Sequence, residues 1–258
     1  MEKNDNIKYN LCEVYDKLIQ KSQKKEIASH CSGNYNGIIN PESEIMINRQ
    51  FGLTFKIDKE GMHDILKEIE KQINNLQKPE IWDYLISTSN IINFYFNGKG
   101  NDEIRKNAYM KAKKETLTLS MIQGKNIGQC AERASVAQNC LVTLTNCGII
   151  DNFNPRLVVS KMYEENGKGS QHAFLILENK NPNKKSILFD IENKIHIKVN
   201  GKTAEVDGLY IITSSELERF NNGEAVQPKD VWSLSGFEVI TFPYSYSENN
   251  TKLIQKGR

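Results

Sequence analysis

The sequence has few cysteines, and no two of them are spaced as a metal-binding or redox pair. It contains five, an odd number, and no two are separated by only two residues: Cys12, Cys31, Cys130, Cys140 and Cys147. This pattern argues against a disulfide framework and against a zinc knuckle. We therefore expect free thiols in a reducing compartment, with no bound metal ion and no other cofactor.

Long apolar runs are also missing. No stretch approaches the roughly 18 consecutive apolar residues that a membrane-spanning helix needs, and the first residues are polar and charged, unlike a secretion signal. We expect a cytoplasmic protein with no membrane partner. The Asn- and Lys-rich composition resembles that of AT-rich bacterial genomes, which leaves delivery as an effector open.

Neither sign of charge is in excess. The 34 basic and 32 acidic residues leave a net charge of +2, which gives no reason to expect nucleic acid as a partner. The 258 residues, 38% of them hydrophobic, can bury a core in one large domain or two small ones. Composition alone thus points to a globular protein without naming its partner.

The apolar spacing changes along the chain from a helical to a strand-like period. Helical spacing predicts helices over residues 11–19, 62–76, 79–94 and 102–120, after which a further helix follows. Short β-rich segments separated by turn residues are predicted at 52–57, 156–160, 172–177, 186–191, 195–199, 208–212 and 237–242. Most of these strands follow one another closely, so we expect an α+β fold with an antiparallel sheet.

The chain is organised around an apolar helix that begins at Cys130. Cys130, Ala134 and Leu141 lie on one stripe of a 3.6-residue period, and Gly148 stands where a helix-ending glycine is favoured. At the first turn of a buried helix, unpaired N–H groups and the helix dipole favour a thiolate. Cys130 is therefore the candidate nucleophile.

Two strand residues complete a candidate catalytic set. A hairpin turn over residues 179–185 could bring His172, on one strand, beside Asp190, on the next. A thiol nucleophile needs a base, and an imidazole needs a group that fixes its tautomer. His196 is a second candidate for the base, although its alternation with isoleucines predicts that it faces solvent, and Glu192 or Asn193 could replace Asp190.

Residues 124–193 resemble the transglutaminase-like superfamily of cysteine enzymes. The resemblance rests on Gly128-Gln129-Cys130, Ala134, Gly148-Ile149, Pro155-Arg156-Leu157-Val158, His172-Ala173-Phe174 and Leu188-Phe189-Asp190. It implies a Cys-His-Asp triad, with a nucleophile helix packed on an antiparallel sheet in a transglutaminase-like or papain-like core. Ala131 and Phe174 replace an aromatic residue and a tryptophan of eukaryotic transglutaminases, which favours hydrolysis over cross-linking.

The oxyanion formed during such a reaction needs hydrogen-bond donors. The backbone N–H of Cys130 is the natural first donor, because it lies at the start of the helix. Gln123 is our preferred second donor, and Gln129 is the alternative.

The expected function is that of a cysteine-dependent amide hydrolase or acyltransferase acting on a protein or peptide through a thioester. Protease, isopeptidase and glutamine deamidase or transglutaminase activities all fit, and an inactive fold serving as a protein-binding module is the alternative. We expect a mainly helical region over 1–100 that covers or extends the core, the catalytic core over 101–245, and a polar tail over 246–258.

Overall fold

The structure is a computed structural model of the 258-residue chain. The residues that it describes are 9–24, 26–28, 33–48, 53–98, 100–112, 116–163, 167–199, 202–228, 230–231, 238–239 and 245–247. Cys31 lies outside these residues. So does most of the predicted strand 237–242, of which only Glu238–Val239 is described, as β11.

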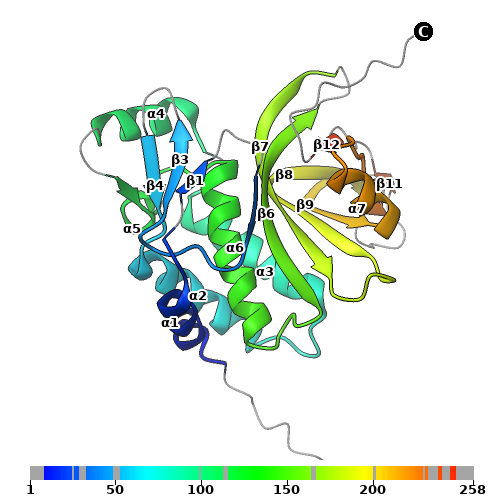
Figure 1. The fold of residues 1–258 in the computed structure, drawn as a ribbon, viewed down its shortest axis with the longest axis horizontal. Coiled ribbons are helices and arrows are strands. Elements are labelled where there is room, and N and C mark those ends of the chain that lie inside the picture. Colours follow the sequence, from blue (N-terminus) through cyan, green and yellow to red (C-terminus); the bar gives the residue numbers. More distant parts are fainter. Residues whose placement is uncertain are drawn as a thin grey trace, which may run out of the picture.

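Helix α6 (Cys130–Asn146) lies at the centre, between a large sheet and the N-terminal helices (Figure 1). Every residue from 131 to 144 is buried. Two buried polar side chains on α6 hold the segment that crosses it: Asn139 exchanges hydrogen bonds with the backbone of Ile39, and Gln138 donates to the carbonyl of Gly37. Burial on all sides explains why these polar side chains of α6 pair with groups of the protein rather than with water.

The large sheet is antiparallel and has the strand order β10-β9-β8-β7-β6-β12, with β2 paired to β6 and β11 to β8. Its strands are β2 (Gly33–Asn36), β6 (Phe153–Tyr163), β7 (Gly169–Asn179), β8 (Ser186–Val199), β9 (Lys202–Ile212), β10 (Asp230–Val231), β11 and β12 (Ser245–Ser247). The α+β class is thereby confirmed.

Both faces of this sheet are apolar. Leu157, Leu175 and Phe189 belong to the main core, which also includes α6. Phe174, one residue away on β7, belongs to a second cluster with Phe220 of helix α7 (Ser214–Asn221). Because side chains alternate across a strand, two buried faces give the nearly continuous apolar runs seen in the sequence.

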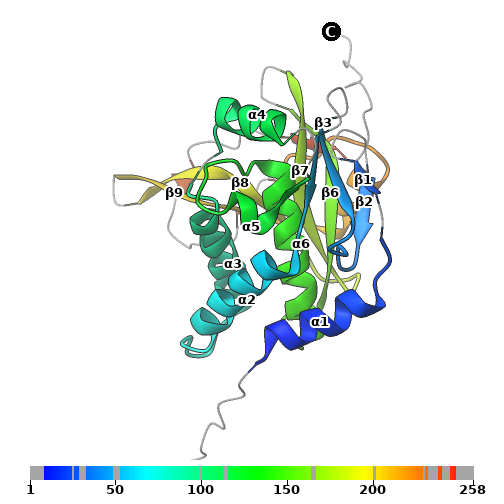
Figure 2. The same ribbon diagram turned by 90° about the vertical axis from the view of Figure 1, so that its left-hand side faces the viewer.

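The N-terminal region combines helices with a second sheet (Figure 2). The helices are α1 (Leu11–Lys21), α2 (Lys59–Ile73) and α3 (Ile81–Tyr95), and the strands are β1 (Glu26–Ala28), β3 (Glu44–Asn48), β4 (Leu53–Lys56) and β5 (Leu117–Thr118). Helices α1 and α3 pack directly on α6. The first hundred residues are therefore less uniformly helical than predicted.

The predicted helix over residues 102–120 is wrong in its second half. Helix α4 covers only Asp102–Lys111, and the short helix α5 covers Leu119–Ile122. Between them, β5 pairs in parallel with β4, matching Leu117 to Phe55. Flanking threonines favour the strand, and a partner sixty residues away is not visible in a local apolar period.

The strands predicted at 186–191 and 195–199 are one strand, β8, with an irregularity between them. The hairpin predicted over residues 179–185 is confirmed, since β7 and β8 pair antiparallel with Leu177 opposite Ile187. Of the polar tail predicted over 246–258, residues 248–258 lie outside the described residues, and Tyr246 belongs to β12 and is fully buried.

Candidate active site

The start of α6 is fixed by contacts from the preceding segments. Gly128 packs against Phe96 so closely that an added Cβ would lie 2.3 Å from the ring carbon Cδ1, which requires glycine there. The N–H of Gln129 donates to the fully buried carboxylate of Glu132, which also receives bonds from Arg105 of α4 at 2.8 and 3.1 Å. These contacts set the position of Cys130, the half-buried first residue of the helix.

His172 and Asp190 are brought together by the β7–β8 hairpin. The ladder pairs Leu175 with Phe189, so its continuation places Asp190 opposite Phe174, two residues from His172 and on the same side of the sheet. Nε2 of His172 lies 2.8 Å from Oδ2 of Asp190, and the two side chains are only 3% and 0% exposed. The predicted pairing of these two residues is thus present in the structure.

Asp190 is surrounded by further hydrogen-bond donors. Its Oδ2 accepts from the hydroxyl of Tyr246 at 2.9 Å and from Nδ2 of Asn193 at 2.8 Å, and its Oδ1 accepts from the backbone N–H groups of Glu192 and Asn193 at 3.2 Å each. Burial alone would raise the pKa of Asp190, but His172 and Asn193 outweigh it and lower that pKa. The carboxylate stays charged inside the protein.

The irregularity in β8 creates this nest of donors. The register with β9 steps from Asp190 opposite Gly208 to Lys194 opposite Asp207, so residues 191–193 fold around the carboxylate. Gly208 makes room for them, because a Cβ there would lie 2.6 Å from the carbonyl oxygens of both Asn193 and Asp190. Glycine at this position is a steric requirement of the site.

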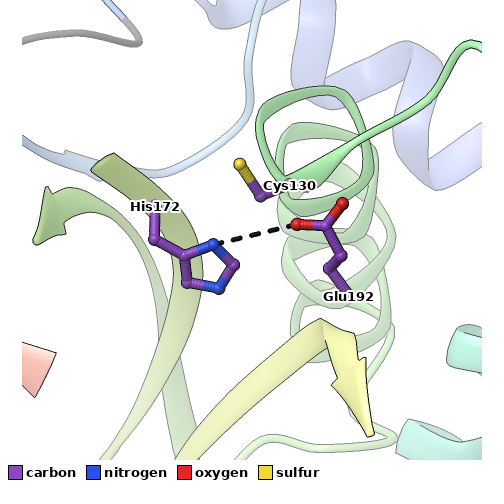
Figure 3. A group of neighbouring side chains, drawn as sticks. All are labelled: Cys130, His172 and Glu192. Atoms are coloured by element: carbon purple, nitrogen blue, oxygen red, sulfur yellow. Dashed lines mark ion pairs between the residues drawn. The ribbon is translucent and has the colours of Figure 1, made fainter. Parts of the chain in front are cut away.

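The second ring nitrogen of His172 faces Cys130 and Glu192 (Figure 3). Nδ1 lies 3.8 Å from Oε2 of Glu192, and one ligand atom each of Cys130, His172 and Glu192 lie within 4.8 Å of one another. Because a carboxylate only accepts hydrogen bonds, the charged Asp190 keeps a ring hydrogen on Nε2, and in the neutral ring the lone pair of Nδ1 faces the thiol.

The surroundings of His172 strongly shift its pKa. Burial by itself lowers the pKa of His172, but the negative charge of Asp190, its hydrogen bond and the neighbouring Cys130 side chain together raise it well above the usual value. Glu192 behaves differently: burial raises its pKa, against a lowering effect from His172. An imidazole that holds a proton beside a thiol is suited to stabilise a thiolate.

Neither predicted glutamine is held toward the thiol. Gln123 is exposed after the end of α5, and within the described part of the chain its side chain forms no hydrogen bond. Gln129 is the residue before α6, and its side-chain amide donates to Asp102 of α4. Their role in an oxyanion hole stays a prediction.

Of the remaining candidate site residues, one is exposed to solvent and two lie at the site. His196 faces solvent as predicted, with a side chain 47% exposed near Glu205. Glu192 and Asn193 lie at the site, but as neighbours of His172 and Asp190 and not in place of them. The sequence did not predict Tyr246 as a residue of the site. Tyr246 and Ser247 precede polar residues and were predicted as part of a tail, and only the alternation of polar and aromatic residues over Ser245-Tyr246-Ser247 indicates a strand.

The other described thiols lie away from this arrangement. Cys140 is fully buried within α6, and burial raises its pKa. Burial likewise raises the pKa values of Cys12 and Cys147, both partly buried. The thiol of Cys12 donates to the backbone carbonyl of His63, whereas Cys130 lies beside the ring of His172.

Comparison of the chain with protein-family models, with curated proteins and with solved structures finds no match. Among the described residues, no helix has both the length and the apolar character needed to cross a membrane. Function is therefore inferred from the geometry of the site.

Proposed function

We propose that this protein is a cysteine-dependent amide hydrolase or acyltransferase with Cys130 as nucleophile, His172 as base and Asp190 as the group that orients the base. One observation carries the proposal. Asp190 holds Nε2 of the buried His172 at 2.8 Å, which turns the other ring nitrogen toward the thiol at the start of α6.

The reaction would begin with transfer of the thiol proton of Cys130 to Nδ1 of His172. The thiolate then attacks the carbonyl carbon of an amide, and negative charge develops on the carbonyl oxygen beside the N-terminal N–H groups of α6. His172 returns its proton to the leaving nitrogen, the carbon–nitrogen bond breaks, and an amine leaves a thioester on Cys130. Water or a second amine resolves the thioester and regenerates the thiol.

Asp190 would act by stabilising the imidazolium and by fixing the ring tautomer. Its charge is retained because five donors, three on Oδ2 and two on Oδ1, surround the carboxylate. Tyr246 and the β8 irregularity therefore support catalysis through Asp190, as positioning elements that need not touch the substrate.

The fold supports a transglutaminase-like core as part of the same proposal. The nucleophile helix α6 packs on antiparallel strands β6, β7 and β8, and the residues follow in the order Cys130, His172, Asp190. Ala131 and Phe174 stand where cross-linking enzymes of that superfamily carry other residues, which favours hydrolysis. The substrate class that fits is a protein or peptide amide, in a main chain, an isopeptide link or a glutamine side chain.

Acyl transfer to the thiol tests the proposal without knowledge of the natural substrate. An activated ester is incubated with the full chain, and the mass of the intact protein and of its peptides is recorded. We expect one acyl group on Cys130, formed more slowly in His172→Ala and absent from Cys130→Ala, whereas the matched control Cys147→Ala behaves like the wild type. Equal acylation of the wild type and His172→Ala would overturn the proposal.

The reaction type is then read from masses of candidate peptides. Hydrolysis gives two fragments, deamidation of glutamine adds about 1 Da, and amine transfer adds the mass of the acceptor. Any of these changes must disappear in Cys130→Ala. A change that persists in that variant belongs to a contaminant and contradicts the assignment.

A further inference from the structure

Glu192 is a third functional group at the site for which the proposed reaction has no use. Its carboxylate oxygen Oε2 lies 3.8 Å from Nδ1 of His172. One ligand atom each of Glu192, His172 and Cys130 lie within 4.8 Å of one another (Figure 3). The three residues come from α6, β7 and β8. We propose that Cys130, His172 and Glu192 form a three-ligand site for Zn²⁺, and that the bound ion silences the thiol.

The three ligand atoms, which lie within 4.8 Å of one another, must come closer together to hold a tetrahedral ion. Zinc bonds of about 2.0 to 2.3 Å to nitrogen, oxygen and sulfur require ligand atoms about 3.4 Å apart. The Nδ1 to Oε2 distance is 3.8 Å. Glu192 can close the difference by rotating, because its side chain is 17% exposed and its carboxylate is not part of the sheet pairing.

The histidine is already oriented as a metal ligand. A histidine that binds a metal through one nitrogen commonly donates its other N–H to a carboxylate, which fixes the ring and increases its basicity. His172 donates Nε2–H to Asp190 at 2.8 Å, and Asp190 is held in turn by Tyr246. The lone pair of Nδ1 therefore points toward Cys130 and Glu192 without any rearrangement.

Charge and ligand type favour zinc over the hard cations. A thiolate and a carboxylate supply two negative charges, which match a divalent ion once His172 has released the proton on Nδ1 and binds as the neutral imidazole. Thiolate and imidazole suit zinc, whereas magnesium and calcium prefer oxygen ligands. Three protein ligands also leave a fourth position for water on the exposed side of Glu192.

Among the described residues, Glu192 forms no ion pair with a lysine or an arginine. Within the described residues, its ion-pair partner is His172. Arg133 of α6 is near enough for its charge to lower the pKa of Glu192, but its guanidinium donates its hydrogen bonds to the carbonyls of Gly128 and Gly98 and to Asn93. The carboxylate is free to bind a cation.

Zinc and acyl transfer would exclude each other. The ion takes the sulfur lone pair that attacks the carbonyl and the Nδ1 lone pair that accepts the thiol proton. Silencing therefore rests on the proposed function, whereas metal binding does not. Zinc binding would reversibly inhibit the reaction of the Cys130 thiol.

Cobalt is the probe for binding, because cobalt bound to a thiolate absorbs in the near ultraviolet. The full chain is treated with a chelator, dialysed and titrated with Co²⁺ and then with Zn²⁺. We expect one equivalent of cobalt, displaced by zinc, with no thiolate band in Cys130→Ser and an affinity at least about tenfold lower in Glu192→Gln. The control Cys147→Ser keeps the band. A band in Cys130→Ser, or unchanged affinity in Glu192→Gln, would overturn the site.

Alkylation measures silencing separately. Zinc should slow labelling of Cys130 by iodoacetamide in the wild type, and the same zinc concentration should protect Glu192→Gln at least about tenfold less. If zinc binds but leaves the labelling rate unchanged, silencing is wrong. If no metal binds while the activated ester still acylates Cys130, the zinc site is wrong and the proposed reaction stands.

Discussion

At the scale of single residues, the environment of each thiol decides its reactivity. Cys130 begins a helix beside a histidine, whereas Cys140 lies inside the same helix without exposure. A thiolate is stabilised by helix N-terminal N–H groups and by an imidazolium, and it is destabilised by burial among apolar atoms. Two cysteines on one helix are thus placed in opposite electrostatic surroundings.

We expect Cys130 to react first with iodoacetamide at neutral pH. Burial raises the pKa values of Cys12, Cys140 and Cys147, so these thiols carry less thiolate and should label more slowly. Peptide mapping by mass spectrometry after short exposure gives the order. First labelling of Cys140 in the folded protein would contradict the assignment.

Asp190→Asn should fold but lose most of the acylation rate, by up to about 10⁴-fold. The amide is neutral and can favour the wrong tautomer of His172, while its size is unchanged. The measurement is the rate of acylation by an activated ester, with circular dichroism to check folding. A rate within a factor of two of the wild type would show that Asp190 does not orient the base.

At the scale of elements, the site depends on one irregular strand. Strand β8 supplies Asp190, then leaves its register with β9 long enough for residues 191–193 to enclose the carboxylate. Gly208 on β9 permits the close approach. A regular strand would leave the buried charge with fewer donors, at a cost of roughly 1 to 3 kcal/mol for each lost bond.

Gly208→Ala should displace the segment 190–193, because the new methyl would lie 2.6 Å from two backbone oxygens. We expect a loss of about 1 to 3 kcal/mol in the free energy of unfolding and a clear fall in the acylation rate. Urea denaturation and acylation kinetics measure the two effects. Gly208→Ser should behave at least as badly. Wild-type stability and rate in both variants would contradict the steric argument.

The helix and the hairpin were predictable because each is local. The period through Cys130, Ala134 and Leu141 predicts α6, and the turn at 179–185 predicts the pairing of the strands that carry His172 and Asp190. The contacts that complete the site are not local. Tyr246 lies 56 residues from Asp190 in sequence, so no spacing rule connects them.

At the scale of the whole molecule, the N-terminal region and the sheet share one core through α6. Its apolar residues run from Leu11 on α1 to Leu209 on β9. Arg105 of α4 binds Glu132 on the first turn of α6, two residues after Cys130. The first hundred residues reach the site through α6 itself, because helices α1 and α3 pack directly on it.

We hypothesise that this region also selects a protein substrate, as its packing next to the nucleophile helix suggests. A whole protein should then have a kcat/KM at least about tenfold above that of a short peptide spanning its reacting residue, because the peptide loses the remote binding energy. Competition between the two in one reaction measures the ratio. Equal values would confine recognition to the surroundings of Cys130.

The bond from Tyr246 to Asp190 also has a consequence for the order in which the chain is made. Synthesis delivers Cys130, His172 and Asp190 to the folding protein well before Tyr246, which closes the nest from β12. A nascent chain would therefore carry its thiol and base before the carboxylate had its full set of donors. Tyr246→Phe removes this one hydroxyl donor from the finished protein and keeps the ring, and slower acylation with the fold retained is the expected result. A rate equal to that of the wild type would show that the other four donors hold the carboxylate of Asp190 without the hydroxyl of Tyr246.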